Sequence, residues 1–230
     1  MSLLIVVAHP DDEVLGCGGL ALGERQRGRD VHSCILSGDV QARRGRPSPE
    51  HLTANMLQAH RLLDLPDPQL GAFPNIAFNT VPHLRLVQFI EGVLSDTRAT
   101  RVVTHHPHDL NDDHRQVSIA CQAAARLSQR LEDVPPLEVL LYMEIQSSTD
   151  WAFPGTERGF EPTAFYPMTD AMLRRKLEAL ECYNGVMRPP PHPRSADAIR
   201  GLAHYRGGQA GVTLAEAYQV AYLNLEDLSA

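Results

Sequence analysis

The sequence predicts an α/β protein in which a mostly parallel sheet carries helices on both faces. Two observations predict this fold. Apolar runs of strand length alternate with segments of helical periodicity along the first two thirds of the chain. The first of these runs, residues 3–8, is apolar at every position, which is typical of a strand buried on both faces of a sheet.

Each element follows from a local pattern. Four apolar runs predict strands, at residues 3–8, 31–36, 101–104 and 137–143. Helical patterns predict helices at residues 19–28, 49–63, 84–94 and 113–131. Ser48 and Pro49 suit the N-cap and the first position of the second of these helices. This order of elements is typical of a Rossmann-like domain.

The last third of the chain has another character. It contains an irregular stretch, an amphipathic helix, a proline-rich stretch that cannot form regular structure and a second helical pattern, at residues 146–167, 170–183, 188–195 and 213–228. We expect a single domain over residues 1–230. Its core would span about residues 1–145, and residues 146–230 would cover the ends of the strands.

The composition limits the partners of the protein. A formal charge of −7 and an isoelectric point near 5.8 argue against nucleic acid and anionic membranes, because such binding depends on clustered Lys and Arg. The first apolar run is too short for a signal peptide, and no window approaches the roughly 20 apolar residues that span a bilayer. The four cysteines form no closely spaced pair, which indicates neither a thiolate zinc site nor a disulfide scaffold. We therefore expect a cytoplasmic protein without membrane insertion, whose oligomeric state the sequence does not predict.

An acidic motif, "AHPDDE", ends the first predicted strand. It places His9, Asp11, Asp12 and Glu13 beyond the carboxyl end of that strand, where open parallel sheets bind their ligands. Neighbouring carboxylates raise one another's pKa and cost free energy unless a cation compensates them. Histidine with aspartate suits zinc, whereas the three glycines that follow lack the spacing of a dinucleotide fingerprint. We therefore expect a divalent metal at this turn.

A second motif supplies further metal ligands. "RVVTHHPHDLNDDHR", residues 101–115, is a predicted strand followed by four histidines and three aspartates within ten residues. A single one of these histidines would more often be a structural loop residue than a ligand. The whole cluster, at the same edge of the predicted sheet, indicates that a third ligand comes from here.

The two motifs resemble, in order and context, those of the PIG-L or LmbE-like family of zinc-dependent deacetylases, which remove the acetyl group from N-acetylglucosamine-type sugars. "YMEIQSSTDW" and "PPHPRS" also resemble later segments of some members, so the likeness spans most of the chain. The resemblance implies that His9, Asp12 and His114 bind zinc and that Asp11 is the general base. It also implies an N-acetylated amino sugar or glycoconjugate as the substrate.

These roles agree with the chemistry of amide hydrolysis, with one departure from the family pattern. Zinc lowers the pKa of its bound water and polarises the amide carbonyl, and Asp11 can take the proton of that water. Many family members have a histidine three residues before the last ligand, but this chain has Asn111. Its amide can stabilise an oxyanion but cannot supply a proton. The leaving amine must therefore be protonated by Asp11 or by a second acid, for which His106, His108 and His192 are candidates.

Other residues are candidates for supporting roles. Asp113, beside the last ligand, is expected to orient a ligand or to cap a helix. Arg43 and Arg44, in the loop after the second strand, and Glu144, at a strand end, are candidate contacts to the substrate, as are the histidines at positions 106 and 192. Trp151 is either a stacking platform for the substrate or a core residue.

Two alternatives to the deacetylase hypothesis stay open. The first is a hydrolase of another N-acyl amide, with a longer acyl chain or a thiol conjugate. The second is a non-catalytic protein of the same fold that binds a sugar or nucleotide and keeps the motif as a metal-stabilised loop. Asp11 favours an enzyme, because a structural metal site needs no carboxylate beside its ligands. The metal is also open, since the His, Asp, His set binds Fe2+, Co2+ or Ni2+ as well as Zn2+.

Overall fold

The computed structural model describes residues 2–38, 48–153, 155 and 159–225. Its strands are β1 (Ser2–Val7), β2 (Asp30–Ile35), β3 (Gln69–Leu70), β4 (Arg101–His105), β5 (Val139–Met143), β6 (Ala164–Pro167) and β7 (Ala215–Leu223). Its α-helices are α1 (Asp12–Gln26), α2 (Pro49–Leu62), α3 (His83–Thr97), α4 (Asp112–Ala124), α5 (Asp170–Glu181) and α6 (Ala196–Ala210). Short 3-10 helices are η1 (Phe78–Thr80), η2 (Leu127–Gln129) and η3 (Thr149–Trp151).

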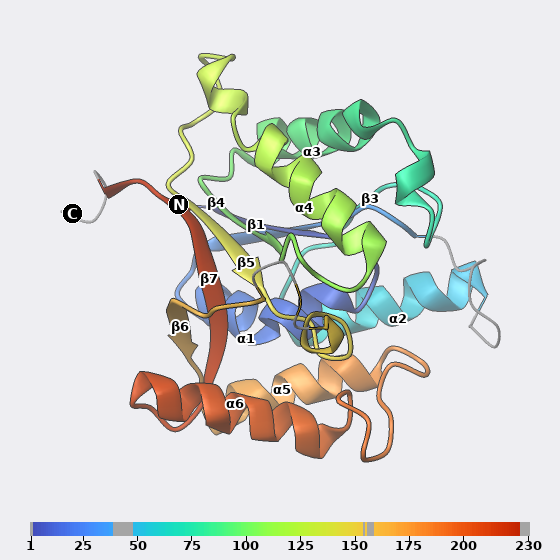
Figure 1. Ribbon diagram of the computed structural model, residues 1–230, viewed down its shortest axis with the longest axis vertical. Coiled ribbons are helices and arrows are strands. Elements are labelled where there is room, and N and C mark those ends of the chain that lie inside the picture. Colours follow the sequence, from blue (N-terminus) through green and yellow to red (C-terminus); the bar gives the residue numbers. More distant parts are fainter. Residues whose placement is uncertain (1, 39–47, 154, 156–158, 226–230) are drawn as a thin grey trace.

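The described strands form one sheet in the order β3-β2-β1-β4-β5-β7-β6 (Figure 1). The first five of these strands are parallel, and β7 runs antiparallel to both of its neighbours. Four of the strands lie within two residues of the predicted bounds, namely β1, β2, β4 and β5. The structure therefore confirms the predicted α/β fold with a mostly parallel sheet.

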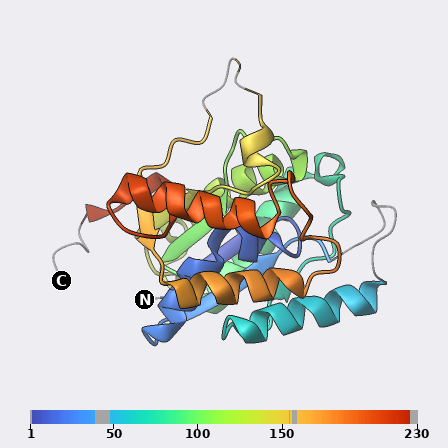
Figure 2. The same cartoon turned by 90° about the horizontal axis from the view of Figure 1, so that it is seen from below.

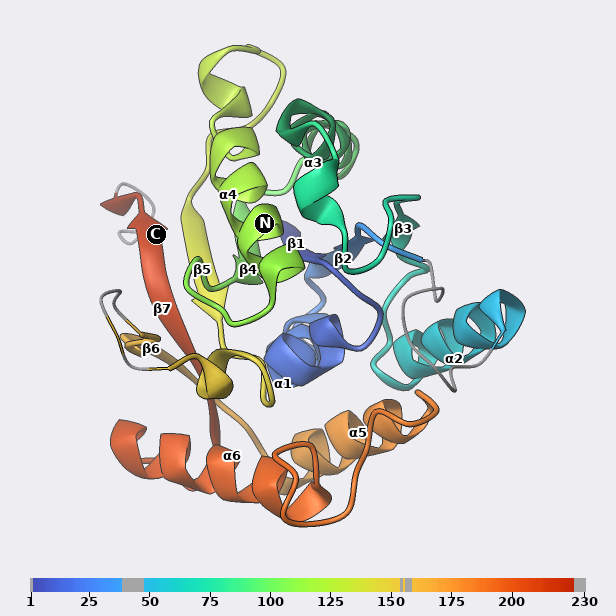
Figure 3. The same ribbon diagram turned by 45° about the vertical axis from the view of Figure 1, so that its right-hand side comes forward.

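Alternate residues of β1 enter two separate cores. Leu3 and Ile5 belong to the core under α1, α2 and α5, and Leu4 and Val6 belong to the core under α3 and α4. All four are at most 2% exposed, so each stabilises the fold by roughly 1.5–3 kcal/mol. Figure 3 shows α3 and α4 on one side of the sheet, and Figure 2 shows the opposite side covered by α2, α5 and α6. The helices on both faces explain why β1 is apolar throughout.

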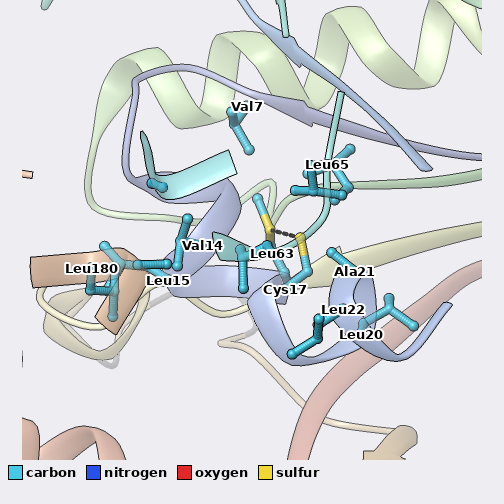
Figure 4. Packing of buried hydrophobic residues seen from close by; sticks show 14 of the residues in the cluster. Val7, Val14, Leu15, Cys17, Leu20, Ala21, Leu22, Leu63, Leu65 and Leu180 are labelled. Atoms are coloured by element: carbon cyan, nitrogen blue, oxygen red, sulfur yellow. Dashed lines mark hydrogen bonds between the residues drawn. The ribbon is translucent and has the colours of Figure 1, made fainter. Parts of the chain in front are cut away.

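The first helix begins earlier than predicted. The periodicity predicted a helix from residue 19, but α1 begins at Asp12 and includes the acidic residues and the glycines of the first motif. Glycine disfavours helices, so the pattern of the sequence alone argued against this start. Burial overrides that preference: Leu15 and Leu20 pack with Leu63 in the core around Cys17 (Figure 4). The helix also contains a break at Cys17, where φ is −148°.

The other predicted helices of the core are confirmed with shifts at their ends. Ser48 Oγ accepts a hydrogen bond from the backbone N–H of His51, so Ser48 is the N-cap of α2. The helix predicted at 84–94 is α3, and the amphipathic stretch at 170–183 is α5. The helix predicted at 113–131 ends at Ala124, and the short η2 follows it.

The prediction for residues 213–228 was wrong. The described part of this stretch contains the strand β7, which pairs with β5 on one side and β6 on the other (Figure 1). Its alanines and glutamate favour helices in isolation, but two neighbouring strands pair with its backbone groups. Strands β3 and β6 were not predicted. The segment after residue 145 therefore extends the sheet as well as covering the strand ends.

The fold contains no membrane-spanning helix in its described part. None of these helices has an apolar stretch long enough to cross a bilayer.

Two neighbouring glycines of α6 should respond in opposite ways to substitution by alanine. A Cβ on Gly207 would lie 2.6 Å from the carbonyl oxygen of Thr213, because the chain folds back over the last turn of the helix toward β7. A Cβ on Gly208 would have no heavy atom within 4 Å. We expect Gly208→Ala to stabilise the protein by about 0.5–1 kcal/mol through helix propensity. We expect Gly207→Ala to destabilise it by about 1–3 kcal/mol through overpacking.

Urea unfolding of both variants beside the unmodified protein measures these changes. Stabilisation by both substitutions would contradict the close approach of Thr213 to the helix.

Candidate metal centre

The candidate site lies where the loops after β1 and β4 meet. These two strands are parallel neighbours, with Val6 opposite Thr104, so their carboxyl ends lie at the same edge of the sheet. The loop after β1 leads into α1 and carries the first motif, and the loop after β4 leads into α4 and carries the second. The topology therefore brings together two motifs that are about a hundred residues apart.

Three side chains converge on one point at this edge. His9 Nδ1 lies 3.3 Å from Asp12 Oδ2, and His114 Nε2 lies 3.2 Å from the same oxygen. One donor atom from each residue falls within 4.8 Å of the other two, and all three side chains are buried. Ligands bound tetrahedrally to zinc at 2.0–2.2 Å would be about 3.3–3.6 Å apart. The distances from Asp12 Oδ2 to the two imidazole nitrogens, 3.3 and 3.2 Å, therefore fit ligands of one zinc ion.

Each of the two histidines is held by a carboxylate on its other nitrogen. Asp113 Oδ2 lies 3.0 Å from His9 Nε2, and Asp109 Oδ2 lies 3.3 Å from His114 Nδ1. Such partners fix the orientation of an imidazole and increase its basicity as a metal ligand. Asp113 was expected to orient a ligand, and the histidine that it contacts comes from the other motif.

The two carboxylates are themselves fixed by hydrogen bonds. Asp113 accepts from the backbone N–H groups of Ile76 at 2.6 Å and Phe78 at 2.9 Å. Asp109 accepts from the hydroxyl groups of Ser148 and Thr149, in the loop after β5. Asp109 was not predicted as a site residue. It belongs to the second motif, but only the bend of its loop brings it back onto the ring of His114.

The charged groups of this cluster shift the pKa values of one another. Burial opposes protonation of His114, but the carboxylates of Asp12 and Asp109 outweigh burial and raise its pKa to about 10. Burial would raise the pKa of Asp12, but His114 and His9 outweigh it and hold that pKa well below its usual value. Two buried carboxylates therefore bind a proton on the imidazole between them. A bound cation would supply the same compensation.

His105 is a neutral neighbour of the cluster. Its ring stacks on that of His114 at a centroid distance of 3.8 Å, and its Nε2 accepts the backbone N–H of Ala8 at 2.9 Å. Burial, together with nearby His114, lowers the pKa of His105 to about 3. His105 therefore packs against a candidate ligand and ties β4 to the end of β1.

Asp11 lies beside the cluster in a strained turn. Its φ of 107° is rare for a residue with a side chain, and such outliers are retained where the surrounding structure enforces them. Glu13 enforces this one: Oε2 accepts the backbone N–H of Asp11 at 3.0 Å, and Oε1 accepts the hydroxyl of Tyr183. The turn directs the Asp11 carboxylate into a cavity.

That cavity has a volume of about 350 Å³ and opens onto the cluster. Its described lining is His9, Asp11, Asp12, Ile76, Leu110, Asn111, Asp112, His114, Ser147, Ser148, Trp151 and Arg194. Arg194, from the proline-rich segment, donates to Asp11 Oδ2 at 3.3 Å and to Ser147 Oγ at 2.7 Å. The sequence did not identify Arg194, because nothing in its local pattern indicates that this segment folds over the first motif.

The remaining predicted residues divide into three groups. Asn111 lines the cavity, and its side-chain oxygen caps α4 by accepting the N–H of Asp113 at 2.9 Å. Glu144, His106 and His192 lie outside the described lining. Arg43 and Arg44 lie outside the residues that the structure describes.

The three residues outside the cavity have other partners. Glu144 forms a two-point ion pair with Arg206, at 2.8 and 2.6 Å. His106 contacts Gln219 at 3.1 Å, and His192 packs edge-on against Trp151. The structure therefore places none of these three beside the donor atoms of the cluster.

The sequence matches the model of one protein family and none of the curated proteins. The model of the PIG-L family, described as GlcNAc-PI de-N-acetylase, matches residues 4–125, more than half of the chain. Among the curated proteins, none matches. The matched residues include both motifs of the site.

Several solved structures resemble the fold over almost the whole chain. The conserved protein TT1542 from Thermus thermophilus is 23% identical, with a TM-score of 0.78 and coverage of 100% of this chain and 99% of that chain. N,N'-diacetylchitobiose deacetylase from Pyrococcus horikoshii is 16% identical, with a TM-score of 0.75 and coverage of 99% and 88%. GalB, the 4-carboxy-2-hydroxymuconate hydratase from Pseudomonas putida, is 17% identical, with a TM-score of 0.75 and coverage of 99% of both chains. At these identities the likeness shows a shared fold.

The raised pKa of His114 predicts how pH affects the stability of chelator-treated protein. The folded state keeps a proton on His114 up to a pKa of about 10, whereas an unfolded histidine releases it near 6.5. The stabilisation is therefore complete below pH 6.5 and is lost as pH rises through 10. In His114→Gln this dependence should be absent, so its unfolding free energy should fall less across that interval than that of the unmodified protein.

Urea unfolding with chelator at several pH values between 6.5 and 10 tests this expectation. Parallel pH profiles for the two proteins would show that Asp12 and Asp109 do not hold a proton on His114.

Proposed function

The chain belongs to the PIG-L family, and from this premise we propose that it is a metal-dependent hydrolase that removes the acetyl group from an N-acetylated amino sugar or glycoconjugate. The observation that carries the proposal is the convergence of His9, Asp12 and His114 on one point beside the carboxylate of Asp11. We propose one catalytic domain over the whole chain, because residues after 145 contribute Ser148 and Arg194 to the cavity.

We propose zinc as the metal, held by His9 Nδ1, Asp12 Oδ2 and His114 Nε2. Three protein ligands with an open position are typical of catalytic zinc, and the carboxylates behind both histidines are typical of zinc sites. When bound there, zinc would polarise the amide carbonyl and lower the pKa of a coordinated water. The same donors also suit Fe2+, Co2+ and Ni2+.

Asp11 is the proposed general base. Its carboxylate lines the cavity next to the cluster and accepts a hydrogen bond from the guanidinium of Arg194 at 3.3 Å. It would accept a proton from the attacking water as the carbon–oxygen bond forms. The NH2 group of Asn111 would donate a hydrogen bond to the oxygen of the tetrahedral intermediate.

Asp11 is also the proposed acid for the leaving amine. The only histidines in the described lining are His9 and His114, which we assign to the metal. Arg194 stays protonated and supplies no proton at neutral pH. Asp11 would therefore return the proton that it accepted, the carbon–nitrogen bond would break, and the products would be acetate and a free amine.

The substrate side of the cavity combines an aromatic ring with polar groups. Trp151 is 46% exposed and lines the cavity, so it is not a core residue. Ser147 and Arg194 lie on the same lining. An exposed indole beside hydroxyl and guanidinium groups suits a sugar ring, which offers an apolar C–H face and polar hydroxyls.

Release of a free amine from N-acetylated sugars is the direct test of this function. Zinc-loaded protein would be incubated with N-acetylglucosamine, its 1-phosphate, a nucleotide-linked N-acetyl sugar and N-acyl analogues of increasing chain length. We expect amine release from an N-acetyl sugar, and preference within the series separates an acetyl pocket from a longer acyl pocket. Metal-dependent binding of these sugars without any release of amine would favour the non-catalytic alternative.

Asp11→Asn should abolish most activity and leave zinc binding intact. Asparagine tolerates the positive φ at this position better than alanine would, so the turn should be kept. Loss of general base and acid should lower kcat by about 100- to 10,000-fold. Asp67→Asn, at an exposed carboxylate outside the cavity lining, is the matched control and should change neither kcat nor zinc affinity.

Amine-release kinetics and calorimetric zinc titration measure both quantities. An Asp11→Asn variant with full kcat would remove Asp11 from the mechanism.

Trp151→Ala should weaken substrate binding. An aromatic stack is worth about 0.5–1.5 kcal/mol, so KM should rise about 2- to 12-fold with little change in kcat. Tyr222→Ala is the matched control, because Tyr222 is 47% exposed and lies at the far end of β7, outside the cavity lining. An unchanged KM in Trp151→Ala would assign the indole to another role.

A further inference from the structure

Helix α1 is built in two parts. Cys17, with φ −148° and ψ 25°, interrupts its helical backbone. The part before the break begins with Asp12 and Glu13 and follows Asp11, so it carries the acidic residues of the candidate site. The part after the break is an ordinary buried helix. The direction of the short first part therefore depends on the backbone conformation at Cys17.

Two buried charged side chains from the last third of the chain bind the backbone on both sides of this break. Lys176 Nζ donates to the carbonyl oxygen of Leu15 at 2.8 Å. Glu216 accepts the N–H groups of Gly19 and Leu20, both at 2.7 Å. The positive charge lies at the carboxyl end of the first part and the negative charge at the amino end of the second, as the helix dipole favours.

Lys176 and Glu216 also form a buried ion pair with each other. Lys176 Nζ lies 2.7 Å from Glu216 Oε1, and the hydroxyl of Tyr218 donates to Glu216 Oε2 at 2.8 Å. The two charged side chains are only 7% and 5% exposed. Desolvation offsets much of the attraction within a buried pair, and apolar replacements of similar size are often equally stable. Stability alone is therefore a weak reason for this pair.

Gly18 and Gly19 of the first motif have no side chains, and this lets Lys176 and Glu216 approach the backbone of α1. A Cβ on Gly19 would lie 3.0 Å from the carboxyl carbon of Glu216, and one on Gly18 would lie 3.2 Å from Lys176 Cγ. A Cβ at either position would crowd the pair, and at Gly19 it would also overlap the sulfur of Met168. The motif "GCGG" thus brings the backbone of α1 close to both charges.

We propose that Lys176 and Glu216 are positioning residues, which hold the break in α1 so that Asp11 and Asp12 face the candidate metal centre. The proposal rests on the proposed function, because it assigns the pair a role in metal binding and catalysis. Lys176 lies on α5 and Glu216 on β7, so the last third of the chain would set the geometry of the first motif.

The double variant Lys176→Met/Glu216→Gln tests this role. It removes both charges, the donor to Leu15 and one acceptor at the break while keeping the sizes of the side chains. If the pair were only structural, a folded variant would bind zinc and turn over substrate normally. A positioning role predicts that zinc affinity weakens about tenfold or more, as for other groups that orient ligands, and that kcat falls with KM unchanged.

Hydrogen exchange gives a readout that needs neither metal nor substrate. In chelator-treated protein, peptides covering residues 9–20 should exchange faster in the double variant, whereas peptides from α3 and α4 should not change. Ile90→Ala, in the core on the opposite face of the sheet, is the control for general destabilisation. It should lower the melting temperature and leave zinc affinity unchanged.

The outcomes separate this proposal from the proposed function. A folded double variant with unmodified zinc affinity, kcat and exchange at residues 9–20 overturns the positioning role, as does an equal loss of zinc affinity in Ile90→Ala. Failure of the unmodified protein to bind zinc or release amine overturns the proposed function instead. If the double variant does not fold, Tyr218→Phe removes the hydroxyl that donates to Glu216 Oε2 at 2.8 Å and to the carbonyl oxygen of Gly16, beside the break, at 3.4 Å. The zinc affinity of this variant must then weaken for the proposal to stand.

Discussion

The carboxylate of Asp12 lies buried between the rings of His9 and His114. The other groups of the site offset the free energy that burial of this negative charge costs. A buried carboxylate must be compensated, and a second one, from Asp109, stands behind His114. In the protein by itself a proton on His114 provides the compensation, which is why its pKa rises to about 10. The same arrangement prepares the cluster for a divalent cation.

The fold delivers these groups through three contributions from distant parts of the chain. Adjacent parallel strands bring the loops after β1 and β4 to one edge. The loop after β5 supplies the hydroxyl groups that orient Asp109, and the proline-rich segment before α6 supplies Arg194. Finally, α5 and β7 place a buried ion pair against the break in α1. The last third of the chain is therefore part of the site as well as part of the sheet.

The side chains of the site indicate the type of reaction better than the fold does. Structures with this fold have been described both as a deacetylase and as a hydratase, so the shape of the sheet does not select the reaction. What supports amide hydrolysis is a set of three metal-type donors with a separate carboxylate, Asp11, held beside them by a strained turn. Among the acidic residues of the described cavity lining, Asp12 belongs to the donor set and Asp112 is paired with Arg115, so Asp11 is the proposed acid for the leaving amine.

The sequence by itself determined the sheet core and the residues of the two motifs. Continuous apolar runs and the residues that follow them are local features, so β1, β4 and the two motifs could be found from the pattern alone. The resemblance to the PIG-L family then singled out His9, Asp12 and His114 within those motifs. Tertiary structure decided the rest. Residues 215–223 form a strand because two neighbouring strands pair with them, against their helical composition. Arg194 reaches the site because the proline-rich segment folds over the first motif, and Asp109 reaches His114 through the bend of its own loop. No local pattern encodes either contact.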